Sequence, residues 1–131
     1  MGRVFISGGK GGLARAVAAR FSAAGWAVDA PSRAELDVGD CSAVEEWFAG
    51  RPAYDLAVCA AGVTKDRPFL KQTEDEWDAV MGVNARGAAW CARCAAAGML
   101  REGREGQVVM IGSYAAYRPA PSQAAYAASK S

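Results

Sequence analysis

Residues 3–24 read RVFISGGKGGLARAVAARFSAA. Arg3–Ser7 is a short apolar run that predicts a strand, and a five-residue glycine-rich stretch separates it from a helix predicted over Leu13–Ala24. Leu13, Val17 and Phe21 recur at every fourth position, so they would share one face of that helix. A strand, a glycine-rich turn and a helix in this order predict the first unit of an α/β fold.

Strand and helix patterns continue to alternate along the chain. Strands are predicted at Arg3–Ser7, Trp26–Ala30, Glu35–Val38, Asp55–Cys59 and Gln107–Ile111. Further helices are predicted from a capping box at Ser42 and Glu45 to Phe48, from a capping box at Thr73 and Glu76 to about Arg101 with a kink near Asn84, and over Ala124–Ser131. The gap between the second and third strands is too short for a crossover helix, so a loop is expected there. We therefore predict a single domain over residues 1–131, with a Rossmann-like, doubly wound parallel sheet in the order 3-2-1-4-5 and no sixth strand.

Composition narrows the function classes. With 131 residues, 52% of them hydrophobic, the chain is long and apolar enough to form a core. The net charge is +1 and no basic stripe stands out, so we expect no binding to nucleic acid. No apolar run is long enough to span a bilayer, so we expect a cytoplasmic protein that does not bind a membrane. The chain has no histidine, which excludes Ser-His and Cys-His catalysis and most zinc sites. We therefore expect no metal, and a general acid or base must be Tyr, Lys, Asp, Glu or Cys.

Four cysteines are present, at positions 41, 59, 91 and 94, and a cytoplasmic location predicts reduced thiols. Cys91 and Cys94 have the spacing of a redox or half-zinc motif. They fall in the middle of a predicted helix without a second cysteine pair nearby, which favours small residues on a packing face instead.

The glycine-rich stretch Gly8–Gly12 lies directly between a predicted strand and a predicted helix. Glycine lets backbone N–H groups approach a pyrophosphate closely, and the helix N-terminus adds partial positive charge. A structural turn without a ligand is the alternative. The position between strand and helix favours phosphate binding.

Tyr126 and Lys130 are four residues apart, one helical turn. An ammonium group beside a phenol favours the phenolate, so the pair can serve as an acid/base catalyst although tyrosine normally titrates near pH ~10. An ordinary exposed helix pair is the alternative interpretation.

Taken together, these motifs resemble the short-chain dehydrogenase/reductase family over the whole chain. Residues 7, 8 and 12–14 match the family's Thr-Gly-x-x-x-Gly-Ile-Gly loop, with Ala14 in place of the last glycine. Asp37-Val38 matches the pair that holds the adenine, and Cys59-Ala60-Ala61-Gly62 stands where the family has Asn-Asn-Ala-Gly, with both asparagines replaced. The catalytic residues of the family match Asn84, Ser113, Tyr126 and Lys130.

The resemblance implies a role for each matched residue. Tyr126 would exchange a proton with the substrate oxygen, Lys130 would lower the pKa of Tyr126 and contact the nicotinamide ribose, and Ser113 would hydrogen-bond the substrate. Asn84 would help to hold a water in a proton relay. The residues expected to contact the cofactor are Ser7, Gly8, Lys10, Gly12, Leu13, Ser32, Arg33, Asp37, Val38, Ala60, Ala61, Gly62, Asn84, Tyr126 and Lys130.

Cofactor choice depends on the end of the second strand, where an acid favours NAD and an arginine accommodates the 2′-phosphate of NADP. Ser32 falls at the acid's place and Arg33 follows it, while Lys10 adds positive charge to the glycine loop. NADP(H) is therefore favoured over NAD(H). A shift of the strand register would put Asp29 at the acid's place and favour NAD(H).

The leading hypothesis is an NAD(P)-dependent oxidoreductase acting on a small carbonyl/alcohol substrate. The rival is a nucleotide-binding module that assembles with a partner and has lost catalysis, and a purely structural protein ranks last. The 131 residues stop within the helix that carries Tyr126 and Lys130, so strand Gln107–Ile111 is expected at the sheet edge. Pairing of that edge with a second copy or a further chain segment is expected.

Overall fold

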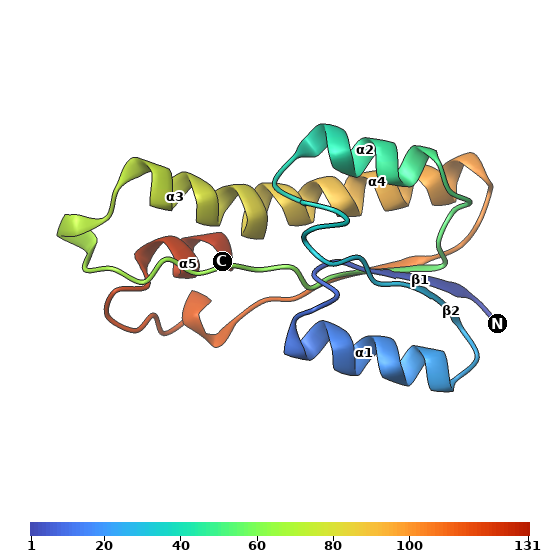
Figure 1. Ribbon diagram of the computed structural model, residues 1–131, viewed down its shortest axis with the longest axis horizontal. Helices are drawn as coiled ribbons and strands as arrows, with labels where there is room; N and C mark the ends of the chain where they lie inside the picture. Colours follow the sequence, from blue (N-terminus) through green and yellow to red (C-terminus); the bar gives the residue numbers. More distant parts are fainter.

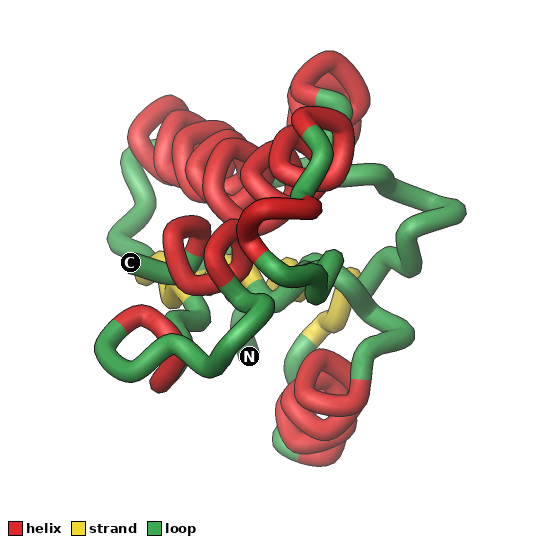
Figure 2. The backbone as a smooth tube through the Cα atoms, turned by 90° about the vertical axis from the view of Figure 1, so that its left-hand side faces the viewer, coloured by secondary structure: helices red, strands yellow, loops and turns green.

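The computed structural model describes residues 1–131 and contains one parallel sheet of four strands in the order β2-β1-β3-β4. Figure 1 shows helix α1 on one face of the sheet and helices α2 and α4 on the other. Figure 2, turned by 90°, shows the same layers, with the strands between two groups of helices. The strands are β1 (Arg3–Ile6), β2 (Ala27–Asp29), β3 (Leu56–Cys59) and β4 (Gln107–Met110).

The helices are α1 (Gly12–Ala23), α2 (Cys41–Ala49), α3 (Glu74–Met81), α4 (Ala88–Arg101) and α5 (Ala124–Ser129). A π-helical segment, Gly82–Gly87, joins α3 to α4, so the interruption predicted near Asn84 takes this form. Short 3₁₀ turns lie at Phe69–Lys71 and Tyr114–Ala116. None of the helices is both long and apolar enough to cross a membrane.

The end of α1 follows from its local sequence. Gly25 has φ of 80°, a conformation that glycine adopts without strain. Its N–H donates to the Ser22 carbonyl and that of Trp26 donates to the Phe21 carbonyl, each at 3.0 Å, which is the Schellman pattern. The rings of Phe21 and Trp26 pack edge to face with centroids 5.0 Å apart, so the hydrophobic contact that usually accompanies this motif is present. The predicted end of the helix at Gly25 is confirmed.

Alternation along β1 divides the core between the two faces of the sheet. Val4 and Ile6 are fully buried against α1, whereas Phe5 is fully buried on the side of α2 and α4. The ring of Phe5 packs edge to face on Phe48 with centroids 4.8 Å apart. Such pairs add about 0.5–1.5 kcal/mol beyond burial.

The face predicted for the first helix is only partly right. Val17 and Phe21 pack against the core as expected, and Ala14 is buried beside them. Leu13, in contrast, is 53% exposed. The inward face therefore begins at Ala14, and Leu13 points toward the carboxyl edge of the sheet, where it lines a hollow described below.

The third predicted strand, Glu35–Val38, is absent, so the prediction of five strands in the order 3-2-1-4-5 is wrong. The Ser32 carbonyl accepts hydrogen bonds from the N–H groups of Glu35 and Leu36, which closes a turn. Leu36 and Val38 are each 5% exposed, whereas Asp37 between them is exposed, so burial alternates here as it does along a strand. They reach the core from a loop, and β2 is consequently an edge of the sheet.

Capping was predicted correctly at one helix and wrongly at another. At α3 the Thr73 hydroxyl accepts from the Glu76 N–H while the Glu76 carboxylate accepts from the Thr73 N–H, so the predicted capping box is present. At α2 the N-cap is Asp40, whose carboxylate accepts from the Ala43 N–H at 3.2 Å. Ser42 lies inside that helix because Asp40 caps it two residues earlier.

The other edge of the sheet is β4, as predicted for this strand. All four of its residues are exposed, and Val108, Val109 and Met110 are 37%, 41% and 54% exposed. Pairing of this edge with a second copy or a further segment stays a prediction.

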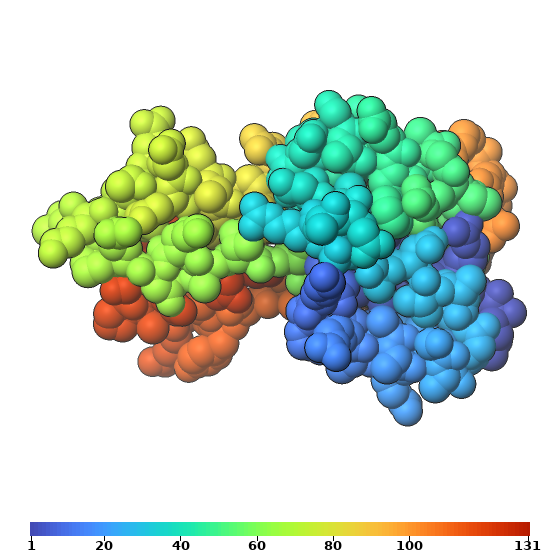
Figure 3. Space-filling model, in the orientation of Figure 1, coloured from blue at the N-terminus to red at the C-terminus, as the bar shows by residue number.

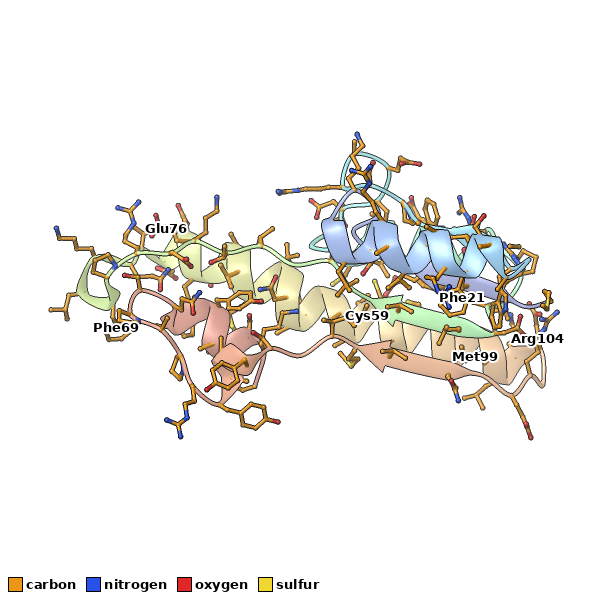
Figure 4. All side chains as sticks on the ribbon, turned by 90° about the horizontal axis from the view of Figure 1, so that it is seen from below. Phe21, Cys59, Phe69, Glu76, Met99 and Arg104 are labelled. Carbon is orange, nitrogen blue, oxygen red and sulfur yellow. The ribbon has the colours of Figure 1, made fainter.

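The opposite end of the strands is held by Asp55. Its carboxylate accepts from the Arg3 N–H at 2.7 Å and pairs with the Arg104 guanidinium at 3.2 Å, so it joins the starts of β1 and β4. Figure 4 shows Arg104 beside Met99, at the far end of the molecule from Phe69. The Arg3 hydrogen bond, with a smaller contribution from Arg104, holds the pKa of Asp55 below its usual range.

We expect Asp55→Asn to remove an acid-dependent part of the stability. A carboxyl whose pKa is lowered by folding stabilises the native state above its unfolded pKa of about 3.9 and loses that contribution as the pH falls through the folded value. Thermal melts between pH 7 and pH 3 should therefore show a smaller acid-induced fall in Tm for the variant, which starts lower at pH 7. Asp66→Asn, in the exposed loop after β3, is the control. Parallel Tm curves for Asp55→Asn and wild type would contradict the assignment.

Candidate cofactor and active site

The glycine-rich stretch connects β1 to α1 at the carboxyl edge of the sheet. The Gly9 N–H donates to the Pro31 carbonyl at 2.8 Å, and a side chain at Gly9 would overlap the carbonyl oxygen of Ala30. The loop therefore lies directly against the segment that follows β2. In contrast, apart from the residues next to Gly12 and the backbone of its own helix, no atom lies within 4 Å of the place where a Cβ of Gly12 would be. The start of α1 is thus open to an approaching ligand, as a phosphate site at a helix N-terminus requires.

Ser7 connects two of the segments at this edge of the sheet. Its side chain is 2% exposed, and its hydroxyl oxygen accepts hydrogen bonds from the N–H groups of Ala60 and Ala61, both at 2.9 Å. These bonds fasten the end of β1 to the segment that follows β3. Ser7 was predicted as a cofactor contact, and the structure places it under the loop as a positioning residue.

A hollow, here called the glycine-loop hollow, opens above these segments. Figure 3 shows the surfaces of the glycine loop (blue), the segment after β2 (cyan) and the segment after β3 (green) meeting near its position. Many of the predicted cofactor residues line it, and Leu36, Val63 and Val83 add apolar walls. The predicted residues in its lining are Gly8, Lys10, Arg33, Asp37, Val38, Ala60, Ala61 and Gly62.

The residue predicted to select the cofactor does not line the hollow. Ser32 is 4% exposed, and its hydroxyl donates to the Glu35 carboxylate at 2.9 Å, so the prediction of a ribose contact at Ser32 is not supported by its position. A hydrogen bond from the Ser32 N–H to the same carboxylate and, secondly, the bond from the hydroxyl lower the pKa of Glu35. Arg33 next to it is exposed and lines the hollow.

Asp29, the residue that would have favoured NAD(H), is also committed elsewhere. Its carboxylate pairs with the Arg3 guanidinium at 2.9 Å and accepts from the Tyr54 hydroxyl at 2.8 Å. Burial and the bond to Asp29 raise the pKa of Tyr54 to about 12. The Asp29 carboxylate therefore makes structural contacts to Arg3 and Tyr54, and Asp29 does not line the glycine-loop hollow.

A second hollow, here called the α5 hollow, contains the Tyr126–Lys130 pair. Both side chains line it, and no hydrogen bond to the protein occupies the Tyr126 hydroxyl. The Lys130 ammonium donates to the Ile111 carbonyl at 2.9 Å, which fixes it at the end of β4. The complete lining is Leu13, Ala60, Gly62, Val63, Thr64, Ile111, Gly112, Gln123, Tyr126 and Lys130.

Asn84 is positioned by the π-helical segment and is 3% exposed. Its amide oxygen accepts from the Val63 N–H at 2.8 Å, while its NH₂ group donates to the Val63 carbonyl and to the Ser129 hydroxyl at 2.8 and 3.0 Å. The side chain therefore ties the segment after β3 to α5, the helix of the Tyr126–Lys130 pair. Both of its donors and one of its two acceptor sites are used in these bonds, so the structure supports a positioning role for the Asn84 side chain.

Ser113 lies just after β4, half-buried, but it does not line the α5 hollow. Its hydroxyl oxygen accepts from the Ala115 N–H at 3.1 Å and caps the 3₁₀ turn. Of the four predicted catalytic residues, Tyr126 and Lys130 thus line one hollow. Asn84 is bonded to the helix that carries them, and Ser113 lies outside the lining of that hollow.

The thiols stand apart from both hollows. Cys91 is fully buried in the core cluster, Cys94 packs against that cluster, and burial raises the pKa of both thiols. Cys59 donates weakly to the Ala88 carbonyl at 3.5 Å, and its pKa is raised to about 11 by burial. The interpretation of Cys91 and Cys94 as packing residues is supported.

Sequence reasoning missed several lining residues. Val83 directly precedes Asn84, and Gln123 lies three residues before Tyr126, so proximity to a predicted catalytic residue could have identified both. Ile111, two residues before Ser113, carries the same signal. Leu36, Val63 and Thr64 do not lie next to a predicted catalytic residue, and the fold brings them to the edge.

Comparison with known proteins agrees with this geometry. Residues 34–131 match the sequence model of the short chain dehydrogenase family. The chain belongs to this family. The short-chain dehydrogenase/reductase prx4 of Penicillium rubens is 30% identical in an alignment of length 149 that covers 98% of this chain and 45% of the fungal protein. The L-xylulose reductase of Mesocricetus auratus is 30% identical over 145 residues, covering 98% of this chain and 59% of the reductase.

Among solved structures, 4-hydroxyisoleucine dehydrogenase complexed with NADH superposes with a TM-score of 0.93 at 24% identity, over 99% of this chain and 63% of the dehydrogenase. This likeness establishes the Rossmann-like fold of this member of the short chain dehydrogenase family. The chain spans about half the length of the curated relatives named above.

Proposed function

We propose that the protein is an NAD(P)-dependent oxidoreductase that transfers a hydride between the nicotinamide and a small carbonyl or alcohol substrate. One observation carries the proposal: the glycine-loop hollow and the α5 hollow share Ala60, Gly62 and Val63 in their linings. A ligand that lies along the glycine loop can therefore extend over these residues to the Tyr126–Lys130 pair. The dinucleotide-type loop and the acid/base pair are parts of one continuous site.

The residues of the chain fit such a cofactor. The open start of α1 and the exposed Lys10 offer N–H groups and positive charge to a pyrophosphate. Val38, Ala61 and Val83 provide apolar surface for a flat ring. When bound, the nicotinamide supplies or accepts the hydride.

At the substrate carbonyl, Tyr126 has the free hydroxyl. In the reducing direction the carbonyl carbon takes the hydride, its oxygen takes the Tyr126 proton, and solvent returns a proton to the phenolate. The Lys130 ammonium, anchored on the Ile111 carbonyl, supplies positive charge to the same hollow. Asn84, through Ser129, holds the helix that carries both groups.

The test is cofactor binding together with turnover. NADPH in large excess over its Kd should raise Tm by about 5–10 °C, since a ligand that binds only the native state stabilises it. NADPH consumption should then depend on an added ketone. Lack of any thermal shift with either NADPH or NADH would exclude the proposal.

A second candidate, a nucleotide-binding protein without catalysis, is favoured by the position of Ser113. Its hydroxyl oxygen is engaged in the cap of the 3₁₀ turn and lies outside the α5 hollow. This candidate predicts the same rise of Tm with NADPH but no ketone-dependent consumption. The two measurements together therefore separate the candidates.

We further propose NADP(H) as the preferred cofactor, because Arg33 and Lys10 line the hollow while Asp29 is paired with Arg3. Arg33→Ala should weaken NADPH binding by about 10- to 100-fold, the usual contribution of a charge-assisted contact, and leave NADH binding within about twofold. Titration calorimetry with both cofactors measures this. Arg20→Ala, at the far end of α1, is the matched control. An equal loss for both cofactors would argue against recognition of a 2′-phosphate by Arg33.

A further inference from the structure

Gln123 immediately precedes α5, three residues before Tyr126. The Ala127 N–H donates to the Gln123 carbonyl at 2.8 Å, so the backbone of Gln123 already takes part in the helical pattern. Side chains three apart lie on the same helical face, about 5–6 Å from each other at Cβ. Both Gln123 and Tyr126 accordingly line the α5 hollow.

The backbone before Gln123 is held in an unusual conformation. Ser122 has φ of 70°, the one non-glycine residue of the chain with positive φ. Its carbonyl accepts from the Arg67 N–H at 3.1 Å, and the Arg67 guanidinium pairs with the Glu76 carboxylate on α3. A strained residue persists only where its surroundings fix it. The segment after β3 and helix α3 therefore fix the backbone at Ser122 and, with it, the direction of the Gln123 side chain.

The Gln123 amide has no partner within the protein, although it can donate two hydrogen bonds and accept others. The other polar side chains of the α5 hollow are accounted for. Lys130 donates to the Ile111 carbonyl and Thr64 donates to the Asp66 carboxylate. Tyr126 is left to meet the reacting oxygen, so Gln123 is the remaining polar group that faces a ligand there.

We propose that Gln123 is a specificity-determining residue that hydrogen-bonds a second oxygen of the substrate. This inference rests on the proposed function. The substrate class is a ketone with an ester, carboxyl or hydroxyl oxygen close to the reacting carbonyl. With the carbonyl at Tyr126, that oxygen meets the Gln123 NH₂ group one helical turn away. Leu13, Val63 and Ile111 surround the remainder of the ligand with apolar surface.

Two ketones of equal chain length test this: ethyl acetoacetate, which carries an ester, and methyl pentyl ketone, which does not. We expect wild type to favour ethyl acetoacetate in kcat/KM, and Gln123→Met, which keeps the length but loses the amide, to reduce that preference about tenfold. Gln123→Asn, which retains an amide, should restore part of it. The loss with methyl pentyl ketone should be several-fold smaller than the loss with ethyl acetoacetate. Tm should change by less than about 2 °C, since the side chain bonds to nothing in the protein.

An equal loss of activity on both ketones in Gln123→Met, or an unchanged preference, would overturn the role of Gln123 while leaving the oxidoreductase intact. If NADPH binds but neither ketone is reduced, the oxidoreductase proposal fails. Calorimetric titration of ethyl acetoacetate into the NADP⁺ complex then decides the inference separately. Binding that weakens in Gln123→Met supports it, and absence of binding, or binding equal in both proteins, rejects it.

Discussion

Tyr126→Phe is expected to lower ketone-dependent NADPH consumption by about 10²- to 10⁴-fold, the usual contribution of a positioned general acid. The phenyl ring keeps the shape of the side chain and removes only the hydroxyl. That hydroxyl has no hydrogen bond to the protein, so its loss leaves no buried group without a partner. Folding should thus remain as in wild type. NADPH binding should weaken far less than turnover, although Tyr126 is also an expected cofactor contact, and the loss should fall mainly on kcat.

Steady-state kinetics with an NADPH titration by calorimetry measures both quantities. Tyr117→Phe is the matched control, since Tyr117 is 85% exposed and lies outside both hollows. It should behave as wild type in both assays. Normal turnover in Tyr126→Phe would remove the acid/base role from this residue, whereas a loss of NADPH binding as large as the loss of turnover would assign the hydroxyl to cofactor binding instead.

The elements that the sequence predicted correctly are those fixed by local chemistry. The end of α1 depends on Gly25 and on the contact between Phe21 and Trp26, all within six residues. The capping box at Thr73 and Glu76 is closed within a single turn. Signals of this kind act over short separations, so they survive without knowledge of the remaining chain.

The errors arise where burial comes from distant parts of the chain. Leu36 and Val38 alternate like strand residues, yet no neighbouring strand pairs with them, because the turn at Ser32 directs the chain away from β2. Leu13 fits the helical period, but the sheet ends before it and leaves it exposed at the edge. Periodicity indicates which residues are apolar at regular intervals and does not say what will cover them.

The candidate site shows the same division. The motif residues at the glycine loop, at Asp37-Val38 and at Tyr126–Lys130 could be identified from spacing and resemblance, and the fold places them around two connected hollows. The bonds that occupy Ser32 and Asp29 could not be predicted, since their partners depend on how the loop after β2 turns. Whether a polar side chain is free to meet a ligand depends on its tertiary contacts, and counting residues along the sequence does not reveal those contacts.

Gly9→Ala is expected to destabilise the protein and to abolish measurable cofactor binding. The new methyl group would overlap the Ala30 carbonyl oxygen, a backbone atom at the end of β2 that cannot rotate away. Relief requires the glycine loop to separate from the segment after β2, which breaks the bond from the Gly9 N–H to the Pro31 carbonyl. Overpacking against a fixed backbone costs about 1–3 kcal/mol or more, and Tm should fall by roughly 5–10 °C.

Gly12→Ala is the informative control for this variant. No other part of the chain lies near the added methyl group, and alanine favours the helix that begins at this residue, so Tm should be unchanged or slightly higher. The same methyl group would extend into the space where we expect the pyrophosphate to lie, and NADPH binding should weaken by at least about tenfold. Loss of binding with stability retained in Gly12→Ala, and loss of both in Gly9→Ala, would separate the ligand-facing glycine from the packing glycine. Unchanged NADPH affinity in Gly12→Ala would place the phosphates elsewhere, and an unchanged Tm in Gly9→Ala would contradict the close approach of the loop to β2.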